Sequence, residues 1–246
     1  MLAKVWQRNW RKVNDAETNP QLRRRLGLQF FLYFCSKTDL NMKALLINGS
    51  PHTNGCTFTA LSIVAEELQK NGIETEIVHI GNKDIRGCIA CGKCAELGHC
   101  VFNDMVNEVA PKFEQADGLV VGSPVYFAGP NGTLTNLLDR LFFSANYPLR
   151  MKVGAAVVSA RRAGTTAAFD RLNKYFTISE MPIASSRYWN MVHGHTPADV
   201  MQDEEGVQIM RILGRNMAFL MRAIAAERER NGLPEKEVTR YTNFIR

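Results

Sequence analysis

From Met42 onward, short apolar runs alternate with amphipathic stretches. The run KALLIN (43–48) is almost wholly apolar, which is typical of a strand buried on both faces. In the stretch 57–70 the apolar residues Leu61, Val64 and Leu68 fall on one helical face, and Asn71-Gly72 follows as a stop signal. The same patterns predict further strands over 73–80, 118–122, 153–159 and 182–184, and further helices over 104–115, 134–143, 165–176 and 204–231.

This order of elements predicts an α/β fold. Strands that alternate with helices, without hairpin signals between them, form a parallel sheet with helices on both faces. Five strands favour a flavodoxin-like, doubly wound sheet in the order 2-1-3-4-5, which binds ligands beyond the carboxyl ends of its strands. Within the helix over 104–115, Asp104 is the expected N-cap, and Pro111 is expected to kink or interrupt the helix.

The first 41 residues differ from the rest. They hold eight Lys/Arg and three Asp/Glu, and so carry +5 of the net charge of +6. We expect 1–41 to be an N-terminal extension and 42–246 to be the folded domain, with Met42 as a possible alternative start. The body has no basic patch with interleaved aromatic residues, so we expect no nucleic-acid partner. The apolar run Leu26–Cys35 is too short to cross a bilayer and no cleavage site follows it, so we expect no membrane association and a cytoplasmic protein.

Three loops follow the first, third and fourth predicted strands. The first, NGSPHTNGCT (48–57), is rich in small hydrogen-bonding residues and opens a helix, which suits one phosphate monoester or an ordinary capped turn. It is neither a G-x-x-x-x-G-K-[ST] loop nor G-x-G-x-x-G. The second, GSPVYFAGPNG (122–132), offers a rigid backbone and aromatic side chains to a flat ring, unless those side chains pack in the core. The third, SARRAGTT (159–166), holds an arginine pair that either faces a ligand or is solvated.

Taken together, GSPHTNGCT, GSPVYFAGPNGTLTNLLDR and ARRAGTTAAFDRLNKYF, followed by MPIASSRYWN, resemble the NADPH-dependent FMN reductase family. The resemblance implies bound FMN, NAD(P)H as electron donor, and a homo-oligomer, either a dimer or a tetramer. It also implies three sets of FMN contacts. The phosphate set is Ser50, Asn54, Gly55, Cys56 and Thr57; the ring set is Pro124, Val125, Tyr126 and Phe127; and the set that closes over the ring's other side is Ala160, Arg162 and Gly164.

A compact cysteine motif lies between the second and third predicted strands. The spacing Cys88-x2-Cys91-x2-Cys94-x5-Cys100 brings four thiols together, as in ligation of a [4Fe–4S] cluster. Free or redox-active thiols and a four-cysteine zinc site stay as alternatives. The spacing resembles the iron–sulfur flavoproteins, a branch of the same family, although Val101 stands where a proline usually follows the fourth cysteine.

Two functions follow from these observations. In the first, NAD(P)H reduces FMN, which then reduces free flavin, a quinone or another small acceptor. In the second, a ferredoxin-like partner passes single electrons through a [4Fe–4S] cluster to FMN. In both, the flavin carries the chemistry and no side chain is predicted to be catalytic. His193 and His195 lack cysteine or carboxylate companions in the sequence, so we expect exposed or packing roles for them.

Overall fold

A parallel sheet forms the centre of the fold. The computed structural model describes residues 41–81, 83–242 and 244. The parallel strands are β1 (Lys43–Asn48), β2 (Glu74–His79), β3 (Gly118–Tyr126), β5 (Val153–Ala160) and β6 (Met191–His193), in the order β2-β1-β3-β5-β6. The predicted flavodoxin-like α/β class is therefore confirmed, and the order agrees for the first four parallel strands, whereas a different segment forms the fifth. A further two-residue strand, β4 (Gly129–Pro130), pairs antiparallel with the end of β3.

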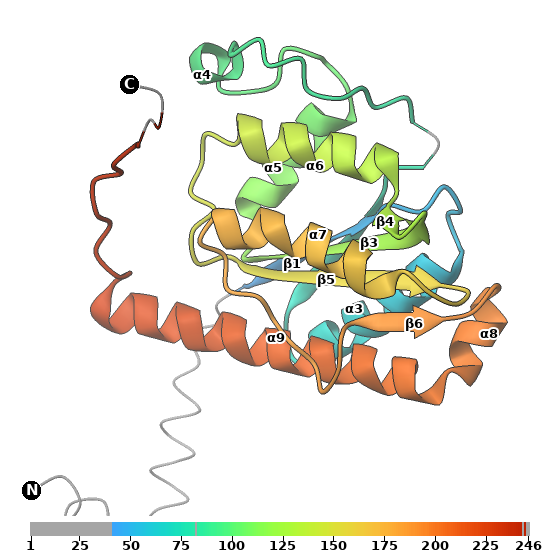
Figure 1. The fold of residues 1–246 in the computed structure, drawn as a ribbon. Coiled ribbons are helices and arrows are strands. Elements are labelled where there is room, and N and C mark those ends of the chain that lie inside the picture. Colours follow the sequence, from blue (N-terminus) through green and yellow to red (C-terminus); the bar gives the residue numbers. More distant parts are fainter. Residues whose placement is uncertain (1–40, 82, 243, 245–246) are drawn as a thin grey trace, which may run out of the picture. The chain divides into compact units, whose positions relative to one another are not determined.

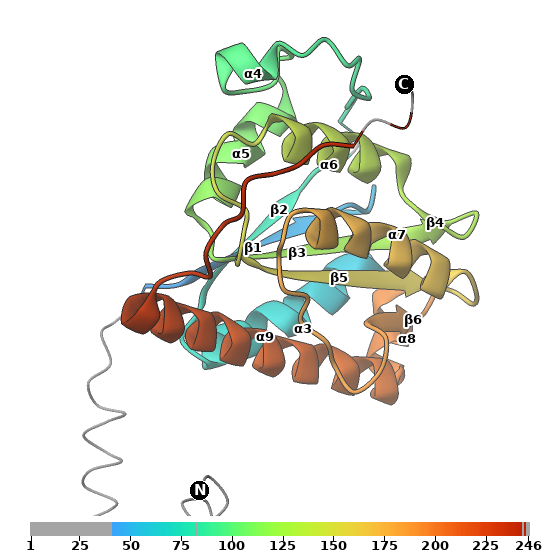
Figure 2. The same ribbon diagram turned by 60° about the vertical axis from the view of Figure 1, so that its left-hand side comes forward.

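Helices cover both faces of this sheet (Figures 1 and 2). One face carries α3 (Cys56–Lys70) and α9 (Glu204–Asn231), and the other carries α5 (Met105–Gln115), α6 (Gly132–Ser144) and α7 (Thr165–Ile178). Two short helices, α4 (Cys94–Leu97) and α8 (Pro197–Gln202), lie in connecting segments. Alternate residues of β1 point to opposite faces, so Leu46 joins the core under α3 and α9, whereas Leu45 and Ile47 join the core under α5, α6 and α7.

The fifth parallel strand lies later in the chain than the sequence predicted. Residues 182–184 form only an isolated bridge between Ile183 and Gly154, whereas Met191–His193 pair with the end of β5. The prediction of a strand over 182–184 was therefore wrong. Pro182 has no N–H for a ladder, and it only accepts a bond from the Gly154 N–H (2.8 Å).

Helix α5 is not interrupted at Pro111, which was one of the two effects expected of that residue. Asp104 caps it as predicted, accepting a bond from the Val106 N–H (3.1 Å), but the helix continues through Pro111 to Gln115. Proline inside a helix costs about 3 kcal/mol. The buried side chains of Val106, Val109 and Phe113 each contribute roughly 1.5–3 kcal/mol, so packing of the opposite face outweighs the exposed proline.

Most helix boundaries agree closely with the predicted ones. The long terminal helix begins and ends where expected, and no end of α3, α6 or α7 differs from expectation by more than two residues. Strand β3, in contrast, continues four residues beyond its predicted end at Gly122. The expected extension over 1–41 lies outside the described residues except for Asn41. In the part of the chain that the structure describes, no helix is both long enough and apolar enough to cross a membrane.

Candidate functional site

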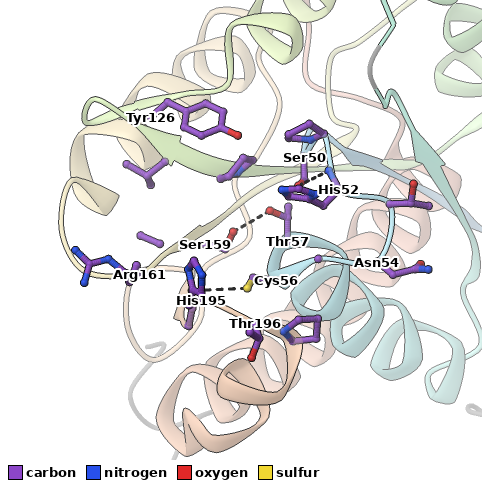
Figure 3. A pocket seen from close by; sticks show the side chains of 18 residues that line it. Ser50, His52, Asn54, Cys56, Thr57, Tyr126, Ser159, Arg161, His195 and Thr196 are labelled. Carbon is purple, nitrogen blue, oxygen red and sulfur yellow. Dashed lines mark hydrogen bonds between the residues drawn. The ribbon is translucent and has the colours of Figure 1, made fainter.

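A cavity of about 760 Å³ opens beyond the carboxyl ends of the central strands (Figure 3). The three predicted loops contribute residues 50–57, 124–126 and 159–161 to its wall, and a fourth loop contributes 194–197. Figure 3 shows Tyr126 and Arg161 on one side of the cavity and Ser50 and Thr57 on the other. A cavity of this size is within the usual range for a cofactor site.

The loop after β1 is held in place by Asn48, whose side chain is fully buried. Its Oδ1 accepts a bond from the Ser50 N–H (3.1 Å), and its Nδ2 donates to the Thr53 carbonyl (3.2 Å). Behind it, His79 Nδ1 lies 3.1 Å from Asn48 Nδ2, and His79 Nε2 lies 3.2 Å from Thr53 Oγ1. Burial lowers the pKa of His79, so the neutral ring is the form that supports this loop.

The N-terminus of α3 points into the cavity without a side-chain cap. Its N-cap residue is Gly55, which has no side chain to accept a hydrogen bond from the N–H groups of the first turn. The first turn also carries no acidic residue. Free N–H groups and the positive end of the helix dipole favour an anion there. Thr57 Oγ1 lies 2.8 Å from Ser159 Oγ, which fixes this turn against the end of β5.

Cys56, the first residue of α3, faces the fourth loop rather than open solvent. Its Sγ donates a bond to the Gly194 carbonyl (3.6 Å). Burial raises the pKa of the Cys56 thiol, with a further contribution from Asp199. The side chain is therefore a neutral thiol that packs at the cavity wall.

The loop after β3, which the resemblance assigns to the flavin ring, forms a hairpin that the sequence did not predict; it is called the ring hairpin below. Strand β3 runs to Tyr126 and turns back into β4 through Phe127 and Ala128, both with positive φ (49° and 61°). Two such residues make the tight turn that suits the twist of a hairpin. Tyr126 lines the cavity together with Pro124 and Val125, and its side chain remains 45% exposed. Phe127 is fully exposed at the turn and is absent from the cavity wall, so neither aromatic packs in the core.

The loop after β5 contributes a different arginine from the expected one. Ala160 and Arg161 line the cavity together with Ser159, whereas Arg162 and Gly164 are not among the lining residues. Gly164 has φ +89°, and a Cβ there would lie 2.9 Å from Ala128 Cα. Its absence of a side chain lets the β3–β4 hairpin approach α7 closely.

The fourth loop was missed by the sequence analysis as part of the site. His195, for which an exposed or packing role was expected, lines the cavity with Gly194, Thr196 and Pro197. Thr196 and Asp199 form a capping box at α8, and the His195 N–H donates to Asp199 Oδ2 (2.9 Å). The sequence T-P-x-D was a usable signal for that helix start, and it places His195 just before it. His52 and Thr53 of the first loop were also missed.

The four cysteines of the compact motif line one small pocket, separate from the cavity. Cys88, Cys91, Cys94 and Cys100 share it with Arg140 and Phe143 of α6. All four are free thiols, and the Ala90 N–H donates to Cys88 Sγ (3.4 Å). In the described chain no three Cys, His, Asp or Glu side chains converge on one metal position.

The donor set nevertheless fits a thiolate-ligated cluster. Four cysteines line one pocket, and amide N–H···S bonds of the kind seen at Cys88 are a usual feature around such clusters. The pocket encloses only about 20 Å³, so a cluster requires the loop to open. Cys88 and Cys91 are exposed, and their movement would not disturb the core.

Comparison with known proteins settles the family. Residues 42–196 match the family described as NADPH-dependent FMN reductase. The chain belongs to this family. It is 32% identical over 191 residues to an iron–sulfur flavoprotein of Methanocaldococcus jannaschii, covering 74% of this chain and 99% of that protein. It is 36% identical over 169 residues to an iron–sulfur flavoprotein of Archaeoglobus fulgidus, covering 67% of this chain and 83% of that protein.

Solved structures confirm the fold. RosB, determined with a bound 8-demethyl-8-formylriboflavin-5'-phosphate intermediate, superposes with a TM-score of 0.60 over 83% of this chain and 94% of its own, at 17% identity. The family and its relatives confirm the predicted class of activity, FMN-dependent oxidoreduction. The individual FMN contacts, the electron donor and the cluster stay predictions.

Proposed function

We propose that this chain binds FMN in the cavity at the carboxyl ends of β1, β3 and β5 and catalyses NAD(P)H-driven reduction of a small acceptor such as free flavin or a quinone. The observation that carries the proposal is the N-terminus of α3, which has no side-chain cap and opens into a cofactor-sized cavity. That terminus suits a phosphate group, and the absence of a G-x-G-x-x-G motif from the loop 48–57 favours FMN over FAD.

The residues around the cavity would divide the binding of FMN among them. Ser50, Asn54 and the turn 55–57 would hold the phosphate, since they surround the free N–H groups of α3. The hairpin residues 124–126 would line the isoalloxazine ring, with the Tyr126 side chain as its aromatic contact. Arg161, in place of the expected Arg162, supplies positive charge on the same side as Tyr126.

The protein's own contribution to the reaction is binding and orientation. When bound, FMN accepts a hydride from a nicotinamide and returns electrons singly or in pairs. The pairing of Pro124 with Ser159 and the Thr57–Ser159 hydrogen bond fix the part of the cavity wall against which the ring would bind. His195 lines the same cavity and its backbone N–H is bonded to Asp199, whereas its ring has no hydrogen-bond partner among the described residues and would be available to the cofactor or substrate.

A second function is favoured by a separate observation, the single pocket that the four cysteines share. As an iron–sulfur flavoprotein, the chain would take single electrons from a ferredoxin-like partner through a [4Fe–4S] cluster to FMN. The names of the two archaeal relatives, which this chain covers over most of their length, support this alternative. We also propose that the protein is a homo-oligomer, either a dimer or a tetramer. Light scattering would measure its molar mass in solution and so test this proposal.

One preparation tests both functions. The full chain is purified without oxygen, and FMN, iron and acid-labile sulfide are measured per chain. NADH, NADPH and reduced ferredoxin are then compared as donors for flavin reduction. One FMN per chain with rapid reduction by a nicotinamide supports the first function, and about four iron and four sulfide with reduction by ferredoxin supports the second. Release of FAD, or no flavin after reconstitution, would contradict both.

A further inference from the structure

Arg140 of α6 is the largest fully buried side chain in the described chain, only 1% exposed, and all of its hydrogen-bond donors are used. Nη1 and Nη2 donate to the two carboxylate oxygens of Asp104 (2.6 and 2.9 Å). Nε and Nη2 donate to Cys100 Sγ (3.3 and 3.2 Å), and Nη1 also donates to the Arg86 carbonyl (3.2 Å). A guanidinium carries five N–H groups, so none is left without a partner.

The two edges of the guanidinium therefore hold two different anionic groups. One edge forms a bidentate pair with Asp104, the usual arrangement for an arginine and a carboxylate. The other edge directs two N–H groups at a single sulfur atom. The face of the guanidinium lies 5.0 Å from the centre of the Phe102 ring, which shields it from water.

A purely structural role does not account for the second edge. The ion pair with Asp104 already balances the charge and joins α6 to the start of α5. A neutral thiol is a weak acceptor, and two charged donors aimed at it gain little. A sulfur that bears negative charge, as a cluster ligand does, is the acceptor that this arrangement suits.

We propose that Arg140 is a positioning residue for the fourth ligand of a [4Fe–4S] cluster. Its Nε–H and Nη2–H would fix Cys100 Sγ toward the shared pocket and raise the reduction potential of the cluster. Reduction adds one electron and no proton, and it increases negative charge on the sulfurs, so hydrogen bonds to a ligating sulfur favour the reduced form. This inference rests on the second proposed function, and it assigns to Arg140 a role that the cysteine spacing alone does not reveal.

The test compares Arg140→Lys with Arg86→Lys in the full chain, each prepared without oxygen and reconstituted with iron and sulfide. Arg86 is the matched control, because its guanidinium lies over the same Phe102 ring (4.5 Å) while its side chain is exposed and makes no bond to a cysteine in the described residues. The cluster is titrated with dithionite at controlled potentials and followed by electron paramagnetic resonance. FMN content of each variant reports folding independently, because the FMN cavity shares no residue with the cysteine pocket.

We expect Arg140→Lys to reduce the equilibrium constant for one-electron reduction on the order of tenfold, a shift of about 59 mV to lower potential. Arg86→Lys should leave the potential unchanged. A second measurement uses wild-type protein labelled with ¹⁵N-arginine, in which pulsed resonance of the reduced cluster should detect a coupled arginine nitrogen. Because this measurement uses wild-type protein, it tests the contact between the arginine and the cluster even if Arg140→Lys does not fold.

The possible results distinguish failure of the role of Arg140 from failure of the second proposed function, on which that role rests. A wild-type protein without stoichiometric iron overturns the second proposed function and the role of Arg140 together. A wild-type protein with a cluster, but with no coupled arginine nitrogen or with equal potentials in the two variants, overturns only the role of Arg140.

Discussion

Replacing Gly55 with Asp tests whether the N-terminus of α3 binds the FMN phosphate. Gly55 has φ −87° and ψ −169°, an extended conformation open to any residue, so the change introduces no backbone strain. A Cβ at this position would lie 3.0 Å from His52 Cβ, so the exposed loop at His52 must shift by a few tenths of an ångström, and the same shift is required in Gly55→Ala. The new carboxylate can accept bonds from the free N–H groups of the first turn, as a phosphate would.

The substitution should have opposite effects on the apo-protein and on cofactor binding. An acidic cap adds a few tenths of a kcal/mol over glycine, and its charge at the helix N-terminus adds about 0.3–1 kcal/mol, so the free energy of unfolding of the apo-protein should rise. The Cβ would lie only 3.7 Å from Ser50 Oγ, which puts the carboxylate inside the proposed phosphate position. At ~5 Å, two unit charges repel by about 1 kcal/mol in water and ~3 kcal/mol at an effective dielectric constant of 20, which predicts about 5- to 150-fold weaker FMN binding.

The assay is a fluorescence titration of the apo-protein with FMN and, in parallel, with riboflavin, which lacks the phosphate. Thermal unfolding of the same samples measures stability. Gly55→Ala is the matched control, because it adds the same Cβ without the carboxylate and should neither stabilise the helix nor repel the cofactor. FMN affinity should fall only in Gly55→Asp, and riboflavin affinity should stay unchanged in both variants.

Two results would refute the reasoning. Equal FMN affinity in wild type and Gly55→Asp would mean that the phosphate lies elsewhere. A parallel loss of FMN and riboflavin affinity would mean that the substitution deforms the cavity rather than competing for the helix N-terminus.

Three further predictions follow from the placement of individual side chains. Arg161→Ala should weaken FMN binding about two- to fivefold, the usual value of an exposed charge, whereas Arg162→Ala should not; equal titration curves would contradict this. Tyr126→Ala should cost on the order of 1 kcal/mol of binding free energy, while Phe127→Ala at the exposed turn should cost none, and the reverse order would show that Phe127 folds onto the ring. His79 has a folded pKa below its unfolded value of 6.5, so the stability it supplies is complete above pH 6.5 and is lost as pH falls through the folded pKa. The thermal midpoint should therefore fall more steeply below pH 6.5 in wild type than in His79→Gln, and equal slopes would refute a role for this ring.

The fold was predictable because its signals are local. Strands β1 and β5 are continuous apolar runs, and α9 combines an apolar face with a glycine stop, so their positions follow from periodicity alone. The edge strand Met191–His193 could not be predicted, since an edge strand of three residues has no distinctive pattern of apolar and polar residues. The hairpin turn at Phe127-Ala128 was missed for a related reason, because it uses two non-glycine residues with positive φ.

The parts of the candidate site that could be predicted are the loops that directly follow correctly predicted strands. The loops after β1, β3 and β5 all contribute to the cavity wall as expected. The loop containing His195 follows β6, and misplacing that strand concealed the loop's part in the site. The choice between Arg161 and Arg162 depends on which way each side chain leaves a loop, and no pattern in the sequence encodes that direction.

Helix α6 lies between the two proposed sites, so a substitution at one site should not affect the other. Its N-cap Asn131 follows the ring hairpin directly, and its backbone N–H receives support from Ser123 Oγ (2.8 Å). Its last turn, with Phe143, borders the cysteine pocket, and Arg140 lies one turn earlier. At 1.5 Å per residue, its 13 residues separate the two ends by roughly 20 Å. A single rigid helix therefore positions both sites without bringing them into contact. Because the sites share no wall residue, a substitution that empties the cysteine pocket should leave FMN bound, and a substitution at Gly55 should leave iron bound.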